Sequence, residues 1–299
     1  MTRRYAILDV FTATPLAGNP LAVVLEGQGL DAARMQAVAR EFNLSETVFV
    51  IEPDNPVHSA RLRLFTPQSE LPFAGHPTVG TAVLLALRKA ENPDLPEAML
   101  VLEEGLGPVR CGVSVKDAVS GHAIFDAPRL PIRMGGLADR ETIAAALGLM
   151  PLELGFENHE PSAFSAGLPV TFVPVRDLDA LAKAKPDLSV WPTAFTNGAP
   201  AAFLYFRDAD HHFRARFFAP TLGVGEDPAT GSAVAALAGV LRRFDDPPAG
   251  THNYVIEQGV EMGRPSLIEL EMDMEGDEVV SVRIGGEAIV VAEGALTID

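Results

Sequence analysis

The chain has 299 residues and a formal net charge of −17 at pH 7, with 47% hydrophobic and 21% charged residues. This composition is typical of a globular protein with enough apolar material for sizeable cores, and the length suggests two domains or lobes. The acidic charge repels phosphate backbones and anionic lipids, which argues against nucleic-acid and membrane partners. An anionic substrate would need a local source of positive potential, which helix N-termini supply without any Lys or Arg.

Cysteine usage and the N-terminal residues bear on the compartment. The single cysteine, Cys111, cannot form an internal disulfide, which fits a reducing environment. Asp9 interrupts the apolar stretch near the N-terminus, so this stretch predicts a first strand rather than a signal peptide. No run approaches the roughly 18 to 20 apolar residues that span a bilayer. We therefore expect a cytoplasmic protein.

Hydrophobic periodicity and turn residues predict alternating strands and helices. In chain order they are strands at 5–11 and 21–25, a helix at 32–42, strands at 48–51 and 61–65, a helix at 81–87, strands at 109–115 and 123–125, helices at 139–147 and 177–185, strands at 201–206 and 214–218, a helix at 231–241 and a β-rich tail at 254–298. Asp31 is a suitable N-cap for the first helix. Ser45 and Glu46 lie on the connection that follows it, where functional side chains are commonly displayed.

The sequence also contains an internal repeat. Residues 61–67 and 214–220 share Arg, Arg, Phe and Pro in register, half a chain length apart. After each block a glycine-containing loop leads into a helix of small residues, near Gly80 in the first half and Gly231 in the second. Chance similarity is the alternative, but two matched blocks in the same order favour a duplication. A duplication predicts two similar α/β lobes whose helix N-termini face one cleft and converge on an anion.

Standard cofactor motifs do not account for the chain. Gly223-Val224-Gly225 lacks the third glycine of a dinucleotide fingerprint, and a phosphate-binding Walker sequence does not occur. His211 and His212 are adjacent, and on a strand their side chains would point to opposite faces, so a joint metal site is not expected.

Three other residues suit acid–base chemistry: Glu46, His76 and Asp227. Each also has a purely structural interpretation, namely a solvated loop glutamate, a structural histidine, and a turn former or helix cap. The repeat gives them more weight, because it places His76 and Asp227 near equivalent helix starts in the two halves.

Several segments resemble the phenazine-biosynthesis PhzF-like isomerase family. The segments that carry the resemblance are 9–11 with 18–20, 43–47, 73–78, 226–233, 258–259, 262–266 and 285–286. They follow one another in order over nearly the whole chain. The resemblance implies the diaminopimelate epimerase-like fold, an α/β (α+β) architecture of two pseudo-symmetric lobes, each a curved mixed sheet around a central helix. We expect one lobe to comprise 1–127 with 283–299 and the other 128–282.

The resemblance also implies an activity and a set of site residues. Members need no metal or organic cofactor, and the characterised phenazine-pathway enzyme isomerises trans-2,3-dihydro-3-hydroxyanthranilate in the cleft between its lobes. By resemblance, Glu46 would move a proton on substrate carbon, while His76 and Asp227 would assist the transfer or orient the substrate. The residues expected to bind the substrate, mainly through its carboxylate, are Asn19, Ser45, Gly75, Gly231 and Ser232. The family also implies a homodimer.

Other functions remain open on the same scaffold. Fold does not guarantee function, so a catalytically silent protein that binds small carboxylates is one alternative, and a lyase or hydrolase using the same base is another. An epimerase with two facing thiols is disfavoured, because Cys111 is the only cysteine and is expected to be a buried residue on a strand.

Overall fold

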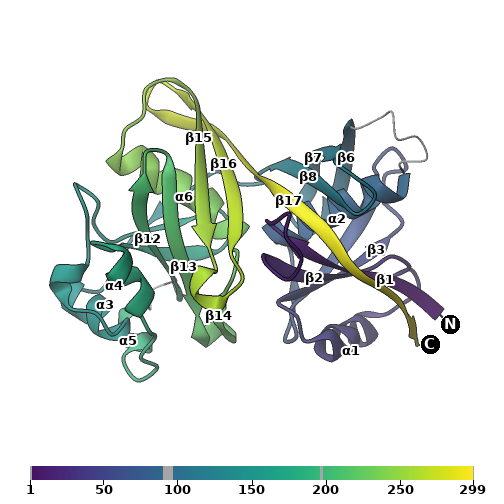
Figure 1. The fold of residues 1–299 in the computed structure, drawn as a ribbon, viewed down its shortest axis with the longest axis horizontal. Coiled ribbons are helices and arrows are strands. Elements are labelled where there is room, and N and C mark those ends of the chain that lie inside the picture. Colours follow the sequence, from purple (N-terminus) through teal and green to yellow (C-terminus); the bar gives the residue numbers. More distant parts are fainter. Residues whose placement is uncertain (1, 90–96, 196–197, 299) are drawn as a thin grey trace. The chain divides into compact units, whose positions relative to one another are not determined.

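The computed structural model describes residues 2–89, 97–195 and 198–298, which divide into two compact units (Figure 1). Unit 1 comprises Met1–Pro128 with Ile284–Asp299, and unit 2 comprises Arg129–Arg283. The chain leaves unit 1 after Pro128 and returns to it within its last strand, β17 (Glu278–Thr297). The C-terminal strand is therefore built into the unit that contains the N-terminus.

Unit 1 is a mixed sheet with two helices. Its elements are β1 (Thr2–Val10), β2 (Asn19–Val24), α1 (Ala32–Phe42), β3 (Glu46–Ile51), β4 (Ala60–Phe65), β5 (Glu70–Leu71), α2 (Gly75–Lys89), β6 (Glu97–Glu104), β7 (Gly107–Val115) and β8 (Ser120–Asp126). Strand β2 pairs antiparallel with β1 and parallel with β3, and β4 pairs antiparallel with β3 and parallel with β6. Strands β7 and β17 extend the ladder at β6 and β1.

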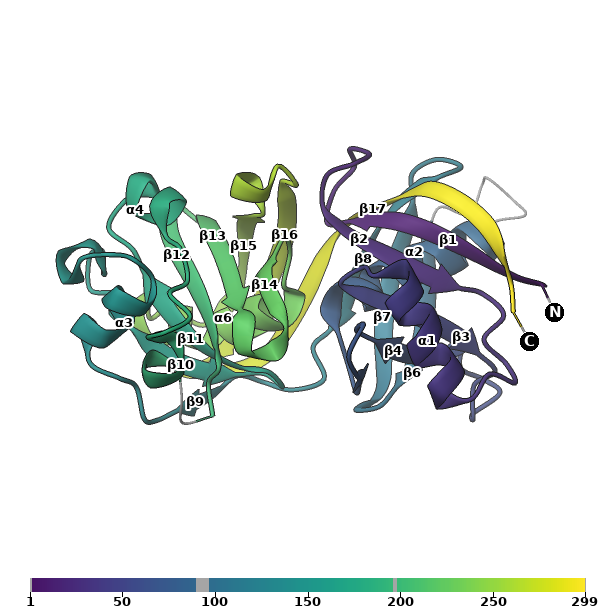
Figure 2. The ribbon, with the colours of Figure 1, turned by 90° about the horizontal axis from the view of Figure 1, so that it is seen from below.

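The two helices of unit 1 have different surroundings. Helix α2 lies against β1, β2, β7 and β8, and most of its side chains are buried. Gly80 permits this close approach, because a Cβ at this position would lie 2.7 Å from side-chain carbons of Val10 and Leu21. Helix α1 covers β3 and β4 from the other side, burying Met35 and Val38 (Figure 2).

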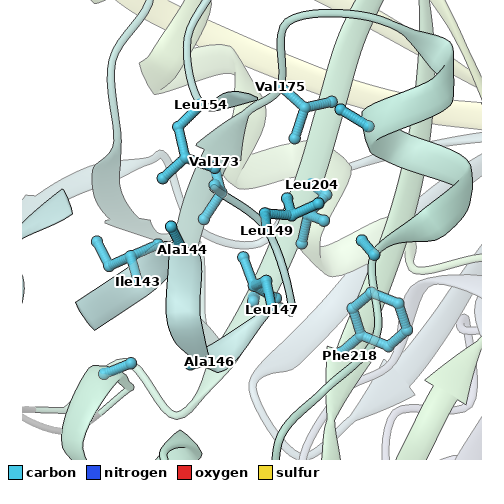
Figure 3. Close-up of a cluster of buried hydrophobic side chains, with 14 of the residues drawn as sticks. Ile143, Ala144, Ala146, Leu147, Leu149, Leu154, Val173, Val175, Leu204 and Phe218 are labelled. Carbon is cyan, nitrogen blue, oxygen red and sulfur yellow. The ribbon is translucent and has the colours of Figure 1, made fainter. Parts of the chain in front are cut away.

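Unit 2 has a similar plan with extra helices. Its elements are β9 (Ile132–Met134), α3 (Arg140–Ala146), β10 (Ser162–Ser165), β11 (Pro169–Pro174), α4 (Leu178–Lys183), α5 (Trp191–Ala194), β12 (Ala201–Ala209), β13 (His212–Ala219), β14 (Val224–Asp227), α6 (Gly231–Phe244), β15 (Gly250–Gln258) and β16 (Ser266–Glu275), with single 3₁₀ turns at Pro151–Glu153, Pro220–Leu222 and Val260–Met262. Helix α6 packs against β9, β10, β11 and β16. Helix α3 and its neighbours form a second core against β11 and β12, where Ile143, Val173 and Leu204 meet (Figure 3).

Both units follow the same order of elements. In unit 1, β4 turns into the short antiparallel strand β5, then helix α2, then β6, which returns parallel to β4. In unit 2, β13 turns into β14, then helix α6, then β15, which returns parallel to β13. The preceding parallel pairs, β2 with β3 and β11 with β12, also correspond. This shared order is what the repeat in the sequence predicts.

Some local expectations were wrong. Helix α2 begins at Gly75, six residues before the predicted start, because the ring of Pro77 fits a first turn whose N–H groups need no helical acceptor. Glu46 is the first residue of β3 rather than a loop residue. His211 lies in the β12–β13 turn with φ of 58° rather than on a strand. Strand β6 was not predicted, since all of its residues except Val101 are Ala, Met, Leu or Glu, which do not favour strands, and its pairing with β7 decides its conformation.

Candidate active site

Three polar side chains meet in unit 1 where helix α2 begins. Strands β2 and β3 run parallel and start at the same edge, so their first residues, Asn19 and Glu46, lie close to each other. Helix α2 packs against both strands and contributes His76, its second residue. The parallel pairing of β2 with β3 and the packing of α2 on both strands therefore bring together residues that are up to 57 positions apart in the sequence.

The contacts place His76 between the other two. Its Nε2 lies 3.2 Å from Oε2 of Glu46, and its Nδ1 lies 3.4 Å from the amide nitrogen of Asn19. The His76 side chain is 5% exposed and that of Glu46 is 16% exposed, while Asn19 is fully buried. Glu46 is thus the member of this group that a small molecule can reach most directly.

His76 is a neutral hydrogen-bonding group. Burial lowers the pKa of its imidazole from 6.5 to about 3. The geometry agrees, because a protonated ring would turn an N–H donor toward the amide nitrogen of Asn19, which is itself a donor. With that amide donating to Nδ1, the single ring proton is on Nε2, at the contact with Glu46.

The start of α2 also offers backbone donors. Gly75 is buried as the first residue of the helix, and the N–H groups of a first turn have no helical acceptor. Ser45 is half-buried and directly precedes Glu46. A carboxylate next to this turn would meet backbone N–H groups and the positive end of the helix dipole.

Unit 2 holds the remaining predicted residues at the start of α6. Asp227 ends β14, and its Oδ2 accepts a 2.6 Å hydrogen bond from the hydroxyl of Thr230, the N-cap residue of α6. Gly231 and Ser232 form the first turn of the helix. Asp227 is therefore not the N-cap itself, which settles one alternative left open by the sequence.

A buried glutamine organises this second cluster. The side-chain nitrogen of Gln258, at the end of β15, donates to the carbonyl of Asp227 at 2.7 Å and to the hydroxyl of Thr230 at 3.1 Å. Its Oε1 accepts from the N–H of Thr230 at 3.2 Å. The adjacent Gly259 has a φ of 79°, and a Cβ there would lie 2.7 Å from the carbonyl oxygen of Pro228. Gln258 and Gly259 thus fix the backbone that presents Asp227.

The eight predicted site residues fall into these two clusters. Asn19, Ser45, Glu46, Gly75 and His76 gather at the start of α2 in unit 1, and Asp227, Gly231 and Ser232 at the start of α6 in unit 2. Sequence reasoning gave no role to Thr230 or Gln258. Both belong to segments that carry the family resemblance, which was the available indication of their importance.

The described residues contain neither a cluster of metal-binding side chains nor a helix that could span a membrane. No group of three or more His, Cys, Asp or Glu side chains is arranged to hold a metal ion within 2–89, 97–195 and 198–298. Over the same part of the chain, no helix combines the length and apolar character required to cross a membrane.

Comparison with known proteins gives consistent results. Residues 8–294 match the PhzC–PhzF family, described as phenazine biosynthesis-like proteins. An uncharacterized isomerase from Mesorhizobium japonicum is 49% identical over 99% of each chain. The trans-2,3-dihydro-3-hydroxyanthranilate isomerase of Pseudomonas aeruginosa is 36% identical over 97% of this chain and 98% of its own. The crystal structure of a PhzF-family phenazine biosynthesis protein from Bacillus anthracis superposes with a TM-score of 0.86 and 25% identity, covering both chains completely. This likeness confirms the expected fold class.

Proposed function

The chain belongs to the PhzC–PhzF family and is an isomerase, and we propose that it moves a proton between two carbons of a small carboxylic acid. The substrate we propose is trans-2,3-dihydro-3-hydroxyanthranilate or a compound of similar structure, because a relative that matches over nearly the full chain bears that name. The observation that carries the proposal is the contact between Glu46 and the neutral His76 beside the first turn of α2.

Glu46 is the proposed base. Its carboxylate takes a proton from a substrate carbon, the released electron pair shifts into the adjacent double bond, and the same carboxyl returns the proton at the far end of that system. Substrate and product then have the same composition, as an isomerisation requires. General acid–base catalysis of this kind typically contributes 10²- to 10⁴-fold to a rate.

His76 is proposed to assist without competing for the proton. A protonated imidazole would form an ion pair with Glu46 and weaken it as a base. Because burial keeps His76 neutral, its Nε2–H donates a hydrogen bond to the carboxyl or to developing negative charge on the substrate. Asn19 holds the ring in this tautomer through Nδ1.

The substrate carboxylate is proposed to bind at helix N-termini. Backbone N–H groups of Gly75, Gly231 and Ser232, with the Ser45 hydroxyl, supply the donors. This choice accounts for the acidic chain as well, since a net charge of −17 would otherwise repel an anion.

Asp227 is proposed to act on the same substrate molecule as Glu46. If so, the losses in transition-state stabilisation caused by Glu46→Gln and Asp227→Asn are not additive. The double variant should then be about as active as the less active of the two single variants. The measurement is kcat/KM for all three proteins with trans-2,3-dihydro-3-hydroxyanthranilate, followed by NMR of the product. If the fold-losses in kcat/KM of the two single variants multiply in the double variant, Asp227 takes no part in the proton transfer.

A panel of small carboxylic acids tests the substrate. Conversion of trans-2,3-dihydro-3-hydroxyanthranilate supports the proposal as stated, and conversion of another acid keeps the reaction and corrects the substrate. Binding without conversion of any acid would favour a silent carboxylate-binding protein, and release of a fragment or uptake of water would favour a lyase or hydrolase.

Three further expectations remain proposals, two from the family resemblance and one, the compartment, from cysteine usage and the N-terminal sequence. We propose a homodimer in the cytoplasm that needs no added cofactor. Light scattering tests the mass in solution, fractionation of the host cell tests the compartment, and activity after dialysis against EDTA tests the need for a metal. A monomer, a membrane-associated fraction or loss of activity with EDTA would each refute one of them.

A further inference from the structure

A second glutamate lies directly behind the first turn of α2. Glu104 ends strand β6 and is buried, with 8% of its surface exposed. Its Oε1 lies 2.8 Å from the hydroxyl oxygen of Thr78, and that oxygen also lies 2.8 Å from the carbonyl oxygen of Ala74. The N–H of Ala74 also faces this carboxyl. The carboxyl therefore contacts both the residue before Gly75 and the first turn of the helix.

The hydrogen atoms in this chain of contacts can be counted. The hydroxyl of Thr78 carries one hydrogen, and the carbonyl of Ala74 can only accept. If Thr78 donates to Ala74, then the remaining contact requires a hydrogen on Glu104, which donates to the Thr78 oxygen. An ionised Glu104 would take the Thr78 hydrogen and leave two oxygens without a hydrogen between them at 2.8 Å. The geometry thus favours a protonated Glu104.

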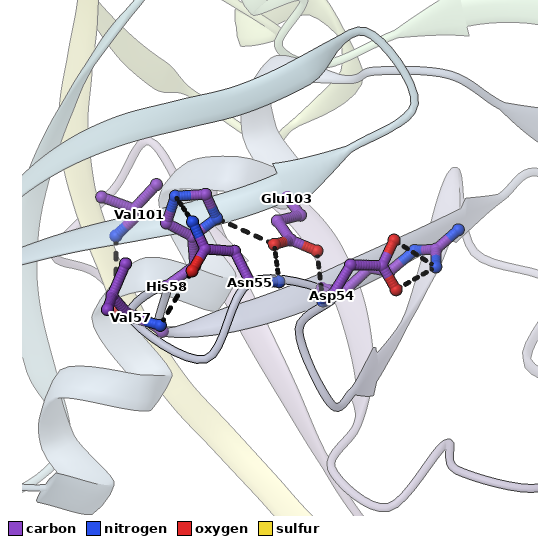
Figure 4. Close-up of polar contacts among 8 residues, drawn as sticks. Asp54, Asn55, Val57, His58, Val101 and Glu103 are labelled. Carbon is purple, nitrogen blue, oxygen red and sulfur yellow. Dashed lines mark hydrogen bonds and ion pairs between the residues drawn. The ribbon is translucent and has the colours of Figure 1, made fainter.

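The neighbouring glutamate provides the contrast. Glu103 points to the opposite face of β6, where its oxygens accept from the N–H groups of Asp54 and Asn55 and contact the His58 ring (Figure 4). These bonds lower the pKa of Glu103, the backbone bond from Asn55 having the largest effect. Burial instead raises the pKa of Glu104 to about 8, against smaller opposing effects of Thr78 and Ala74. Two adjacent glutamates of β6 therefore differ in charge at neutral pH: Glu103 is ionised on one face of the strand, and Glu104 is protonated on the other.

Among the described residues, burial, Thr78 and Ala74 determine the pKa of Glu104, and no cation contributes to holding a carboxylate there. On β7 the Cys111 thiol is buried, and burial together with Glu104 and Asp126 of β8 raises its pKa far above the usual range. On α2, His76 lies two residues before Thr78, and burial keeps it neutral. On β4 the guanidinium groups of Arg61 and Arg63 are engaged by Asp54 and Glu70.

We propose that Glu104 is a positioning residue that bears a proton when the enzyme is active, and that this proton preserves the anion-binding character of the α2 N-terminus. In the neutral state Glu104 fixes the first turn by hydrogen bonds and adds no charge. In the ionised state its negative charge would offset the roughly half positive charge of the helix N-terminus and repel a substrate carboxylate. This inference rests on the proposed function, because it assumes that the carboxylate binds at Gly75.

The test compares the wild type with Glu104→Gln and the matched control Glu103→Gln. Gln is nearly isosteric, and its amide can donate to Thr78 as the protonated acid does, so this variant keeps the contacts but cannot ionise. Infrared difference spectra of wild type minus Glu104→Gln should show a protonated carboxyl band at pH 6 that disappears above pH 8. The spectrum with Glu103→Gln should show a carboxylate band at pH 6.

Affinity for anthranilate, an aromatic carboxylate used as the probe, is then measured by calorimetry at pH 6, 7.5 and 9.5. The wild type and Glu103→Gln should lose about fivefold in affinity at the highest pH, on the scale of a charge at a helix terminus, while Glu104→Gln stays constant. A missing protonated band at pH 6, or a parallel decline in Glu104→Gln, would overturn this proposal. Absence of binding in all three proteins at every pH would instead contradict the proposed carboxylate site itself.

Discussion

His76 shows how burial converts an ionisable side chain into a neutral donor. Its ring is 5% exposed, and burial lowers its pKa to about 3. One ring nitrogen lies 3.4 Å from the amide nitrogen of Asn19 and the other lies 3.2 Å from Oε2 of Glu46, so the neutral ring has a polar neighbour on each side. The sequence suggested this residue through its place near a helix start, but its charge state depends on packing against β2 and β3, which only the fold provides.

The depressed pKa of His76 predicts an acid-sensitive contribution to stability. The folded protein binds this proton less readily than the unfolded chain, whose histidine has a pKa near 6.5. The contribution is therefore fully present above about pH 6.5 and is lost as the pH falls toward 3. Urea unfolding of the wild type and of His76→Gln at pH 7.5, 6 and 4.5 should show a difference in unfolding free energy that shifts against the wild type as the pH falls.

The exposed His211, in the β12–β13 turn, provides the control. Its side chain is 52% exposed, so His211→Gln removes a histidine without removing a buried ring and is measured in parallel. A constant difference between the wild type and His76→Gln would mean that His76 titrates in the folded protein much as it does in the unfolded chain.

Among the residues of the two clusters, the sequence pointed to side chains suited to acid–base chemistry and gave no indication of those that hold them in place. Glu46, His76 and Asp227 have side chains whose chemistry suggests a role. Gln258 could not be recognised in this way, because its contacts with Asp227 and Thr230 join residues about thirty positions apart and depend on the register of β15. Glu104 was missed for the same reason.

At the scale of elements, the two long helices present their first turns in related ways. Helix α2 follows the short strand β5 and begins with Gly75 and His76, while α6 follows β14 and begins with Gly231 and Ser232. Each start is held from a neighbouring strand, by Glu104 at the end of β6 in unit 1 and by Gln258 at the end of β15 in unit 2. The repeat predicted the two helices, whereas the side chains that support them differ between the units.

Replacing Gln258 by Met should separate positioning from folding. Met has a similar length but removes the three hydrogen bonds to Asp227 and Thr230, leaving the buried Thr230 N–H without its acceptor. We expect a loss of about 1 to 3 kcal/mol in unfolding free energy. We also expect kcat to fall about tenfold with KM changed less, because a shift of Asp227 affects the transition state most.

Gln36→Met is the control for these measurements. Gln36 lies on α1, which carries none of the site residues, and donates to the carbonyl of Thr66 at 2.8 Å. Its replacement should leave kcat unchanged. A normal kcat in Gln258→Met would show that Asp227 needs no support from β15.

At the scale of the whole molecule, one unit is built from a single stretch of chain and the other from two stretches. Unit 2 is a single stretch, Arg129–Arg283, and contains the only tryptophan, Trp191, in its α3 core. Unit 1 is completed by the C-terminal part of β17, which pairs with β1 from Thr2 to Val10. Intrinsic tryptophan fluorescence therefore reports the unfolding of unit 2, and circular dichroism reports both units.

A chain that ends at Arg283 should lose unit 1 and keep unit 2. Removal of 284–299 leaves one side of β1 without its antiparallel partner and exposes the buried Ile284 and Ala288 contacts. We expect the urea transition of Trp191 fluorescence to persist, while the far-ultraviolet signal loses about half of its cooperative change. Simultaneous loss of both transitions would show that unit 2 depends on unit 1 for its stability.

The central claim is that Glu46 carries the proton, and one measurement tests it most directly. The wild type, Glu46→Gln and the control Glu52→Gln are incubated in deuterated water with trans-2,3-dihydro-3-hydroxyanthranilate, and deuterium in the substrate and product is followed by NMR. Glu52 follows β3 and is exposed, so it matches the charge change away from His76. We predict isomer formation with deuterium incorporation in the wild type and in Glu52→Gln, and neither in Glu46→Gln, with substrate affinity largely retained. Near-normal conversion by Glu46→Gln would contradict the account.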